Sequence, residues 1–369
     1  MSDSPFLVTF VSMVALAAAV LATFLLYVVV RYSPIIGRIF EEKPLFLPLR
    51  LQPPAVREDV RFQTADGLEL AGSYLHARTS HRIGVIVFCH EYLGDRWSYQ
   101  AYTEPLRDAG FDVFAFDFRN HGASASEPSY RPLQWVTDHE VRDLEGALSY
   151  LRSRVDHDPA GFGLFGVSRG GSAALAATAH TQDVWGVITD GAFPTHGTMF
   201  AYILRWAEIY VGNEVLWKHM PHWVFHFLAT SGRLRSEKRL RCRFPNIEAA
   251  VPAIAPRPWL MIHGGKDAYI GPAIAERLFA LARQPKEKWI VPGAKHNRCR
   301  EVQPAAYAER IAAFLGKYAP RRPLGAEATE KTAEGARWSL PTSGGNAEMG
   351  LGLKAEMPVA GKLAEPVRG

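Results

Sequence analysis

Short apolar runs that alternate with helical stretches constrain the fold of this chain more than any other feature. Buried parallel strands appear in a sequence as continuous apolar runs, and helices between them cover both faces of the sheet. The apolar runs are Ile83–Phe88, Phe111–Phe116, Phe162–Phe165, Trp185–Thr189, Trp259–Ile262 and Lys288–Val291. The helical stretches are His139–Arg152, Ser172–Ala179, Ala273–Ala282 and Ala305–Tyr318. The pattern predicts an α/β fold with a mostly parallel sheet.

Two antiparallel strands are expected before the first of these runs, because apolar and polar residues alternate on both sides of the hairpin signal Asp66-Gly67. The core then comprises about eight strands, drawn from residues 56–191 and 256–318. Residues 192–255 interrupt the alternation and are far longer than an ordinary connection of about 2–6 residues. They carry several Trp and Phe side chains on stretches that we expect to be helical. We therefore interpret this segment as a helical cap inserted into the core.

Composition excludes several classes of protein. Hydrophobic residues make up 48% of the chain, which excludes a wholly disordered or fibrous protein. A net charge of +5 on 369 residues does not indicate a nucleic-acid-binding protein. The three cysteines are too few for a disulfide framework, and no Cys/His spacing is typical of a zinc site. We expect no metal and no cofactor.

Residues 6–30 contain no charged side chain. A membrane-spanning helix needs about 20 apolar residues, so this run is long enough to cross a bilayer. A secretory signal peptide is the alternative, but its start is basic, whereas residues 1–5 form a short tip without Lys or Arg. We therefore expect an uncleaved single-pass membrane anchor. Arg31, Arg38 and Lys43 follow the span, which favours a cytoplasmic location for the rest of the chain.

The segments that flank the core are expected to be irregular. Residues 31–55 hold five prolines, a density that resists regular structure, so we interpret them as a semi-rigid stalk. Residues 319–369 are rich in Ala, Gly, Pro, Glu and Lys and lack apolar periodicity. We expect this tail to be disordered.

A nucleophile motif follows the apolar run that ends at Phe165. Gly166-Val167-Ser168-Arg169-Gly170 has the G-x-S-x-G pattern, and an Ala-rich helix follows it. In this strand–turn–helix context the serine hydroxyl projects above the sheet, and side chains at the two glycines would collide with the neighbouring strand or helix. The alternative is a glycine-rich turn with an inert serine. We predict that Ser168 is a nucleophile.

A serine hydroxyl needs a base, and a third group must orient that base. In this architecture the chain order is serine, acid, histidine. Asp267 and His296 each follow a predicted strand, at the sheet edge where α/β proteins place their ligand sites. Each has a simpler interpretation, namely a turn or helix-cap aspartate and a solvated loop histidine. Together they predict a triad with Ser168, and Asp190 is the second candidate for the acid.

Two backbone N–H groups are expected to stabilise an oxyanion. The first is that of Arg169, at the N-terminus of the helix after the nucleophile. The second comes from the loop after Ile83–Phe88, where Tyr92 is the candidate and Glu91 the alternative.

These residues together resemble the α/β-hydrolase superfamily, and in particular its membrane-tethered esterase and lysophospholipase-like serine hydrolases. The resemblance covers about residues 56–318. It is carried by the serine motif, the loop at His90 and the segments 117–124, 263–267 and 293–297. It implies that Ser168, Asp267 and His296 are nucleophile, acid and base. Superfamily members that hydrolyse epoxides or haloalkanes use an aspartate nucleophile, so Ser168 argues against both activities.

The chain departs from the family pattern at two places. Glu91 replaces the usual glycine of the oxyanion loop, and Arg119-Asn120 replaces the usual Arg-Gly. A carboxylate at position 91 would oppose an oxyanion if it pointed inward, and would pair with Arg96 or Arg169 if it pointed away. These departures leave the triad intact but weaken the substrate assignment.

Two further patterns occur in the predicted cap. His219, His222 and His226 fall at helical spacing, but Pro221 interrupts them, which favours a cap surface over a metal site. The run Arg233–Arg243 has six basic residues and one acidic residue. It predicts either a solvated face or a surface for anionic lipid headgroups. We do not expect it to bind nucleic acid.

The sequence therefore predicts a membrane-anchored serine hydrolase that cleaves a carboxylic ester or thioester. An aromatic cap favours an apolar acyl or lipid substrate. Three alternatives stay open: a serine peptidase, an acyltransferase with the same triad, and a non-catalytic binding module of this fold.

Overall fold

The computed structural model describes residues 5–41, 47–210 and 220–320. The chain divides into two compact units. Lys43–His196 and Pro245–Gly369 form what we call the sheet unit, and Met1–Glu42 and Gly197–Phe244 form the helical unit.

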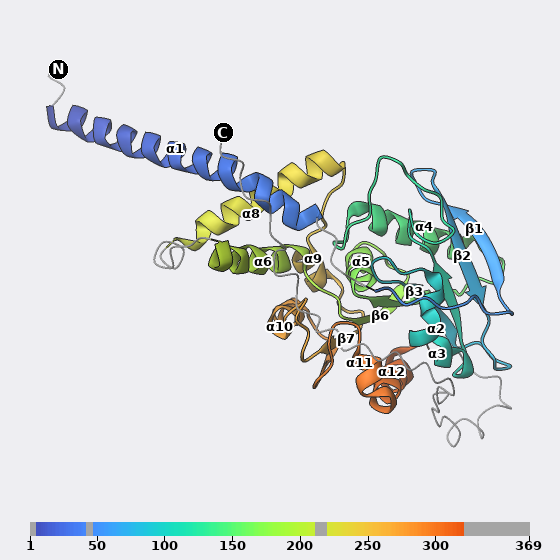
Figure 1. The fold of residues 1–369 in the computed structure, drawn as a ribbon. Coiled ribbons are helices and arrows are strands. Elements are labelled where there is room, and N and C mark those ends of the chain that lie inside the picture. The colour runs from blue at the N-terminus through green and yellow to red at the C-terminus, as the bar shows by residue number, and fades with distance from the viewer. Residues whose placement is uncertain (1–4, 42–46, 211–219, 321–369) are drawn as a thin grey trace. The chain divides into compact units, whose positions relative to one another are not determined.

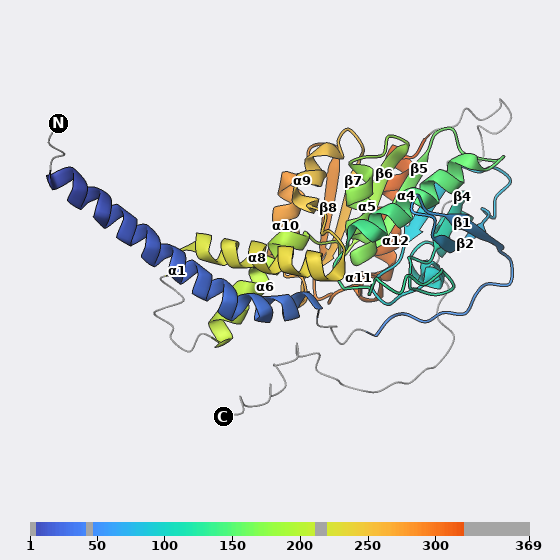
Figure 2. The ribbon, with the colours of Figure 1, turned by 90° about the horizontal axis from the view of Figure 1, so that it is seen from above.

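An eight-stranded sheet organises the sheet unit (Figure 1). Its strands are β1 (Glu58–Gln63), β2 (Glu69–Leu75), β3 (Gly84–Cys89), β4 (Phe111–Phe116), β5 (Phe162–Val167), β6 (Val184–Asp190), β7 (Trp259–Gly264) and β8 (Lys286–Val291). They lie in the order β1-β2-β4-β3-β5-β6-β7-β8, and Figure 2 shows β8 at one edge and the β1–β2 hairpin at the other. β1, β2 and β4 pair antiparallel, and the remaining pairs are parallel. The α/β fold with a mostly parallel eight-stranded sheet is thereby confirmed.

Helices cover both faces of the sheet because successive strand residues point to opposite faces. In β3, Val85 and Val87 join one apolar cluster, whereas Ile86 and Phe88 join another. The first cluster contains side chains of α4 (Asp138–Ser153), α5 (Arg169–Thr178), α9 (Ile247–Ala250) and α10 (Pro272–Leu281). The second contains side chains of α2 (Tyr99–Tyr102), α3 (Glu104–Asp108), α11 (Cys299–Val302) and α12 (Pro304–Tyr318). The continuous apolar runs in the sequence follow from burial on both faces.

The inserted segment is shorter than the predicted cap. We expected residues 192–255, but only Gly197–Phe244 belong to the helical unit. Ile247, Val251 and Ile254 are buried in the first apolar cluster of the sheet unit. Their burial against the sheet-covering helices assigns α9 and the short 3₁₀ helix after it to the core.

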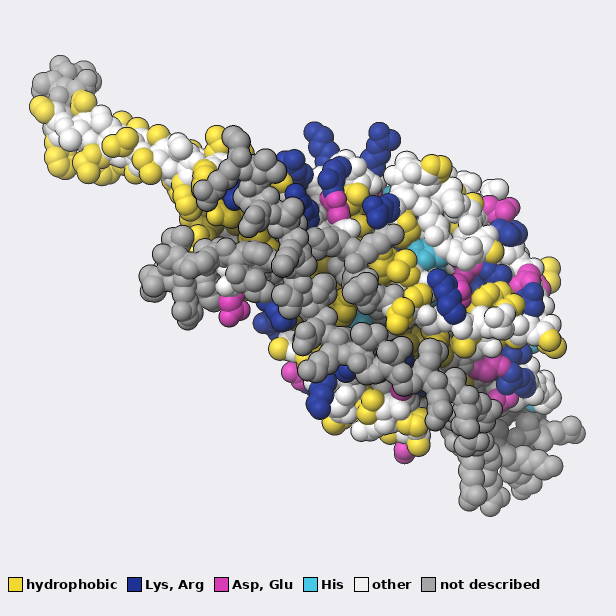
Figure 3. Space-filling model, viewed as in Figure 1, with side chains coloured by type: hydrophobic (Ala, Val, Ile, Leu, Met, Phe, Trp, Pro, Cys, Tyr) yellow, Lys and Arg dark blue, Asp and Glu magenta, His cyan; other side chains and the backbone are white. Residues whose placement is uncertain are grey.

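The helical unit contains α1 (Pro5–Glu41), most of α6 (Thr195–Tyr210) and α8 (His222–Leu240). Helix α1 is longer than the predicted span 6–30, so the first part of the predicted stalk is helical and Pro34 lies inside the helix. A proline removes one hydrogen bond of a helix interior. Packing offsets this cost, because Val28, Ser33 and Ile36 are buried. The earlier part of α1 exposes apolar side chains, as Figure 3 shows.

Residues 47–55 of the predicted stalk form neither helix nor strand, as expected, and residues 42–46 lie outside the described part of the chain. The Gln100 side chain donates a hydrogen bond to the Gln52 carbonyl at 2.8 Å, and Arg50 pairs with Asp95 at 2.8 Å. This segment is therefore held along the loop after β3. The predicted disorder of the tail 319–369 concerns residues that, from 321 onward, lie outside the described part of the chain.

Candidate active site

Ser168 occupies a sharp turn between β5 and α5, with φ 51° and ψ −117°. A non-glycine residue with this backbone stores on the order of 1–3 kcal/mol of strain. The flanking glycines make the turn possible, as the sequence predicted. A Cβ at Gly166 would lie 2.5 Å from the Gly171 Cα, and a Cβ at Gly170 would lie 2.2 Å from the Cys89 carbonyl oxygen. The Ser168 N–H donates to the Asp190 carbonyl oxygen at 2.7 Å, which also holds the turn.

The structure brings Ser168, His296 and Asp267 into one hydrogen-bonded chain. The Ser168 Oγ lies 2.8 Å from the His296 Nε2, and the His296 Nδ1 lies 2.6 Å from the Asp267 Oδ2. The other oxygen of Asp267 accepts backbone N–H bonds from Tyr269 at 2.9 Å and Ile270 at 2.8 Å. With the proton of the imidazole on Nδ1, facing the carboxylate, Nε2 is free to accept the serine proton.

The surroundings of Asp267 favour its ionised form. Burial alone raises the pKa of this carboxyl, but the charge of His296 and its hydrogen bond lower the pKa below the usual value. Asp190, the second candidate for the acid, is engaged elsewhere. It accepts a hydrogen bond from the Tyr307 hydroxyl at 3.0 Å, and burial raises its pKa to about 6. Asp267 is therefore the carboxylate that contacts the imidazole.

The two predicted oxyanion donors lie at the N-terminus of α5 and in the turn after β3. Arg169 is the first residue of α5, where a backbone N–H has no acceptor within its own helix. Tyr92 is the second residue of a turn that the Gly94 N–H closes onto the Glu91 carbonyl at 3.0 Å, and Leu93 has a positive φ of 60°. Within the described chain, the Tyr92 N–H donates no backbone hydrogen bond. Both N–H groups are thus available to a bound anion.

His90 fastens this turn to the sheet. The Phe118 N–H donates to its Nε2 at 3.1 Å, so the proton resides on Nδ1, which lies 2.8 Å from the Glu91 carbonyl oxygen. Burial, together with the nearby Arg169 charge, lowers the pKa of His90 to about 3. The ring is therefore neutral and serves as a fixed bridge between the ends of β3 and β4.

Among the described residues, the Glu91 carboxylate forms no ion pair with Arg96 or Arg169, contrary to the predicted pairing. It accepts a hydrogen bond from the Ser98 hydroxyl at 3.2 Å and one from the Leu49 backbone. Arg96 pairs instead with Asp117. Arg169 lies 3.4 Å from the Glu140 carboxylate. Because Glu91 is buried without a cation, its pKa rises to about 7.

Gly191 is a site residue that the sequence reasoning missed. It has φ 72°, and a Cβ there would lie 3.2 Å from the His296 Cε1 and 2.8 Å from the Asn297 Oδ1. A side chain here would crowd the imidazole, so the absence of a Cβ leaves room for the ring. The sequence feature that could have identified Gly191 is its position directly after β6, at the same edge of the sheet as Ser168.

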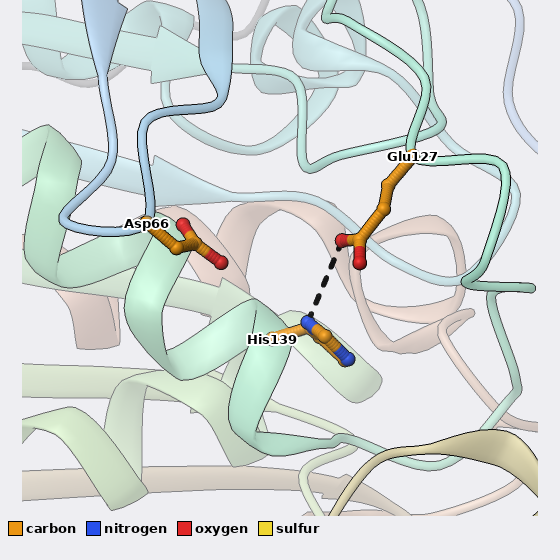
Figure 4. Close-up of side chains that lie close together, drawn as sticks. All are labelled: Asp66, Glu127 and His139. Carbon is orange, nitrogen blue, oxygen red and sulfur yellow. Dashed lines mark ion pairs between the residues drawn. The ribbon is translucent and has the colours of Figure 1, made fainter.

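A second cluster of polar side chains lies apart from Ser168. Asp66, Glu127 and His139 converge, as Figure 4 shows, in an arrangement that could hold a metal ion. The Arg119 guanidinium fits the position better than a metal does. It is fully buried, donates to Asp66 at 3.0 Å and to Glu127 at 2.7 Å, and forms a further ion pair with Asp143 at 2.7 Å. This cluster is the counterion shell of a buried arginine.

The three histidines of the predicted cap do not form a group in the structure. His226 stacks on Phe200 with ring centroids 4.0 Å apart, and His222 lies 6.5 Å from the same ring. His219 lies outside the described residues.

Comparison with known proteins agrees with this architecture. The sequence profile of the alpha/beta hydrolase family matches residues 86–310, which is more than half of the chain. The chain belongs to the alpha/beta hydrolase family. The family and the fold support hydrolase activity in general.

Curated relatives are distant in sequence and match most of the chain. The uncharacterised protein YfhR of Escherichia coli K12 is 25% identical over 268 residues, which are 71% of this chain and 81% of YfhR. The alpha/beta hydrolase domain-containing protein WAV2 of Arabidopsis thaliana is 24% identical over 298 residues, covering 79% of this chain and 88% of WAV2.

Solved structures share the hydrolase fold. An esterase of Pyrococcus furiosus superposes with a TM-score of 0.54 at 20% identity, over 73% of this chain and 96% of the esterase. The alpha/beta hydrolase GrgF of a Penicillium species gives a TM-score of 0.55 at 20% identity, over 72% and 99% of the two chains. At this identity the likeness shows the fold alone.

Replacing Arg119 tests the role of the buried cluster. Arg119→Met leaves Asp143 buried without a counterion and is expected to lower the free energy of unfolding by about 3–5 kcal/mol. Arg119→Met combined with Asp143→Leu should recover part of this loss. Arg142→Met is the comparison variant: Arg142 is half-buried and pairs with Asp138 at 3.2 Å near the surface, so its loss should cost less than about 1 kcal/mol. Urea unfolding of the detergent-solubilised chain measures all three, and equal losses for Arg119→Met and Arg142→Met would contradict the assignment.

Gly191→Ala tests the placement of the histidine. The added methyl group pushes the His296 ring by a few tenths of an ångström, and because a misplacement of about 1 Å can cost about 100-fold, activity on an acyl ester is expected to fall by about 10-fold. Gly67→Ala is the matched control, because Gly67 has a similar φ of 80° but no atom within 4 Å of the added Cβ. Both variants place alanine at a positive φ and should lose stability in thermal unfolding, and Gly191→Ala should lose more because its Cβ also crowds Asn297 and His296. Unchanged activity of Gly191→Ala would refute the steric argument.

Glu91→Gln tests the buried carboxyl of the oxyanion loop. Its pKa is about 7 in the folded chain and near the ordinary 4.5 when unfolded, so the folded state binds more protons in this window and stability falls as pH rises. Glutamine removes this dependence. The stability of the variant relative to the native chain should therefore rise between pH 5 and pH 8, by up to about 3 kcal/mol. Unfolding curves at several pH values measure it. Exposed Glu69→Gln is the control, and parallel profiles for the native chain and Glu91→Gln would refute the shift.

Proposed function

We propose that this chain is a membrane-anchored serine hydrolase that cleaves a carboxylic ester or thioester of an apolar acyl or lipid substrate. One observation carries the proposal: the hydrogen-bonded chain from the Ser168 Oγ through His296 to the Asp267 carboxylate. A hydroxyl, an imidazole and a carboxylate in this order are the arrangement that acyl transfer requires.

In the first half of the proposed reaction, the His296 Nε2 takes the proton of Ser168 as its Oγ attacks the carbonyl carbon. Asp267 holds the imidazole in the required tautomer and stabilises the imidazolium. The backbone N–H groups of Arg169 and Tyr92 stabilise the oxyanion of the tetrahedral intermediate. Collapse of this intermediate breaks the ester or thioester bond, and the leaving group takes the proton from the imidazolium.

In the second half, water attacks the acyl-enzyme. His296 accepts a proton from the water molecule as the new C–O bond forms, and returns it to the Ser168 Oγ when the acyl–serine bond breaks. The products are a carboxylic acid and the free enzyme, so no cofactor is needed.

The anchor is part of the proposal. Residues Pro5–Arg38 of α1 are long and apolar enough to cross a membrane, with a mean hydropathy of 2.7 in their most apolar window. The basic residues Arg31 and Arg38 at the C-terminal end of this stretch favour a single pass with the hydrolase domain in the cytoplasm. An enzyme held at a bilayer meets apolar acyl substrates that partition into lipid.

A fluorophosphonate probe tests the nucleophile. The native full-length chain in detergent or vesicles should become labelled, and Ser168→Ala should not. Hydrolysis of acyl esters should fall on the order of 10⁴–10⁶-fold in this variant, because the remaining groups retain only weak catalysis. Ser172→Ala is the matched control, since Ser172 is also buried at the start of α5 but contacts the Phe193 backbone rather than His296.

The same assay separates the alternatives. Hydrolysis that favours long-chain over short-chain esters supports a lipid substrate. Cleavage of peptides but not esters would indicate a peptidase, and transfer of the acyl group to an added alcohol would indicate an acyltransferase. Folded protein without any labelling would refute the triad mechanism and leave a binding module.

A further inference from the structure

Helix α1 has a free part and a covered part. Every residue from 5 to 24 is exposed, whereas from Leu25 onward residues at helical spacing are shielded, with Val28, Ser33 and Ile36 buried. The free part spans about 30 Å at 1.5 Å per residue, which matches the thickness of the hydrocarbon core of a bilayer. The free part alone is therefore long enough to cross the membrane, and the covered part begins near the membrane surface.

Helix α8 lies beside the covered part and runs in the same direction. A Cβ at Gly37 would lie 3.8 Å from the Ser236 Oγ, and Glu41 pairs with Arg239. A later residue of α1 therefore meets a later residue of α8, as in parallel helices. The N-terminal half of α8 consequently points back along α1, toward the free part.

The exposed face of α8 changes in character along its length. Trp223, Phe227 and Leu234 lie on one side of the helix and are 48%, 38% and 53% exposed, although large apolar side chains favour burial. Toward the C-terminus the exposed side chains are basic, among them Arg235 and Lys238. Figure 3 shows basic side chains projecting over this end of the helix.

We propose that α8 is an interfacial helix whose N-terminal half enters the surface of an anionic bilayer beside α1, while its C-terminal half stays at the headgroups. Its aromatic half would enter the boundary between headgroups and acyl chains, about 5–10 Å deep. Its basic half contacts lipid phosphates, to which Lys and Arg side chains near the surface are attracted. The order of the two halves fits the direction of α1, because the aromatic half points toward the free, membrane-crossing part. The inference rests on the proposed anchoring by α1.

Spin labels on the full-length chain test this arrangement. A nitroxide at Phe227→Cys is compared with one at Ala18→Cys in the free part of α1 and one at the fully exposed Val155→Cys of the sheet unit. The native cysteines are buried, so they do not compete for the label. The chain is reconstituted in phosphatidylcholine vesicles with and without phosphatidylglycerol. Collision with oxygen reports lipid, and collision with an aqueous nickel complex reports water.

The label at Phe227 is expected to be several-fold more accessible to oxygen relative to nickel than the label at Val155, as is the label at Ala18. Arg235→Gln with Lys238→Gln should reduce this ratio at Phe227 in vesicles that contain phosphatidylglycerol and leave it unchanged in pure phosphatidylcholine.

Three results would overturn the inference. If the Phe227 label is as accessible to nickel as the Val155 label while the Ala18 label is in lipid, α8 is not an interfacial helix but α1 is still an anchor. A Phe227 label shielded from both reagents shows that protein covers the stripe. An Ala18 label in water refutes the anchor and the inference together. Fluorophosphonate labelling of the same samples reports the triad independently.

Discussion

The close approach of the β5–α5 turn to the end of β3 is the constraint on which the rest of the site depends. The Gly170 backbone lies so near the Cys89 and His90 carbonyl oxygens that no side chain fits between them. This contact brings the N-terminus of α5 beside the turn that contains Tyr92. Two chain segments far apart in the sequence thereby present free N–H groups near one strained serine. Strain at Ser168 persists because packing and a hydrogen bond from its own N–H to the Asp190 carbonyl hold it in place.

Buried polar groups, rather than flexible surface charges, stiffen the loops around this contact. His90 is neutral and bridges two strand ends. Glu91 accepts hydrogen bonds from Ser98 and from the Leu49 backbone, so it joins the loop after β3 to residues 47–57. A glycine could make no such link. These hydrogen bonds explain why a glutamate can stand where the family pattern has glycine. The Glu91 carboxylate pairs with neither Arg96 nor Arg169.

In the helical unit, tertiary packing overrides local preference. The proline-rich stretch after the apolar run would by itself favour an irregular stalk, yet α1 continues through Pro34 to Glu41. One lost hydrogen bond is offset by burial of side chains such as Val28 and Ile36. Helix propensity is a weak determinant when a helix has an apolar stripe to bury.

The sequence by itself determined most of the order of strands and helices, the hairpin at Asp66-Gly67 and the turn at Ser168. These features follow from strand periodicity and from glycine stereochemistry, which are local properties. Only the tertiary structure decided that Asp267 rather than Asp190 meets the imidazole, that Gly191 makes room for it, and where α1 ends. Each of these outcomes depends on distances between segments far apart along the chain, and no local pattern encodes such distances.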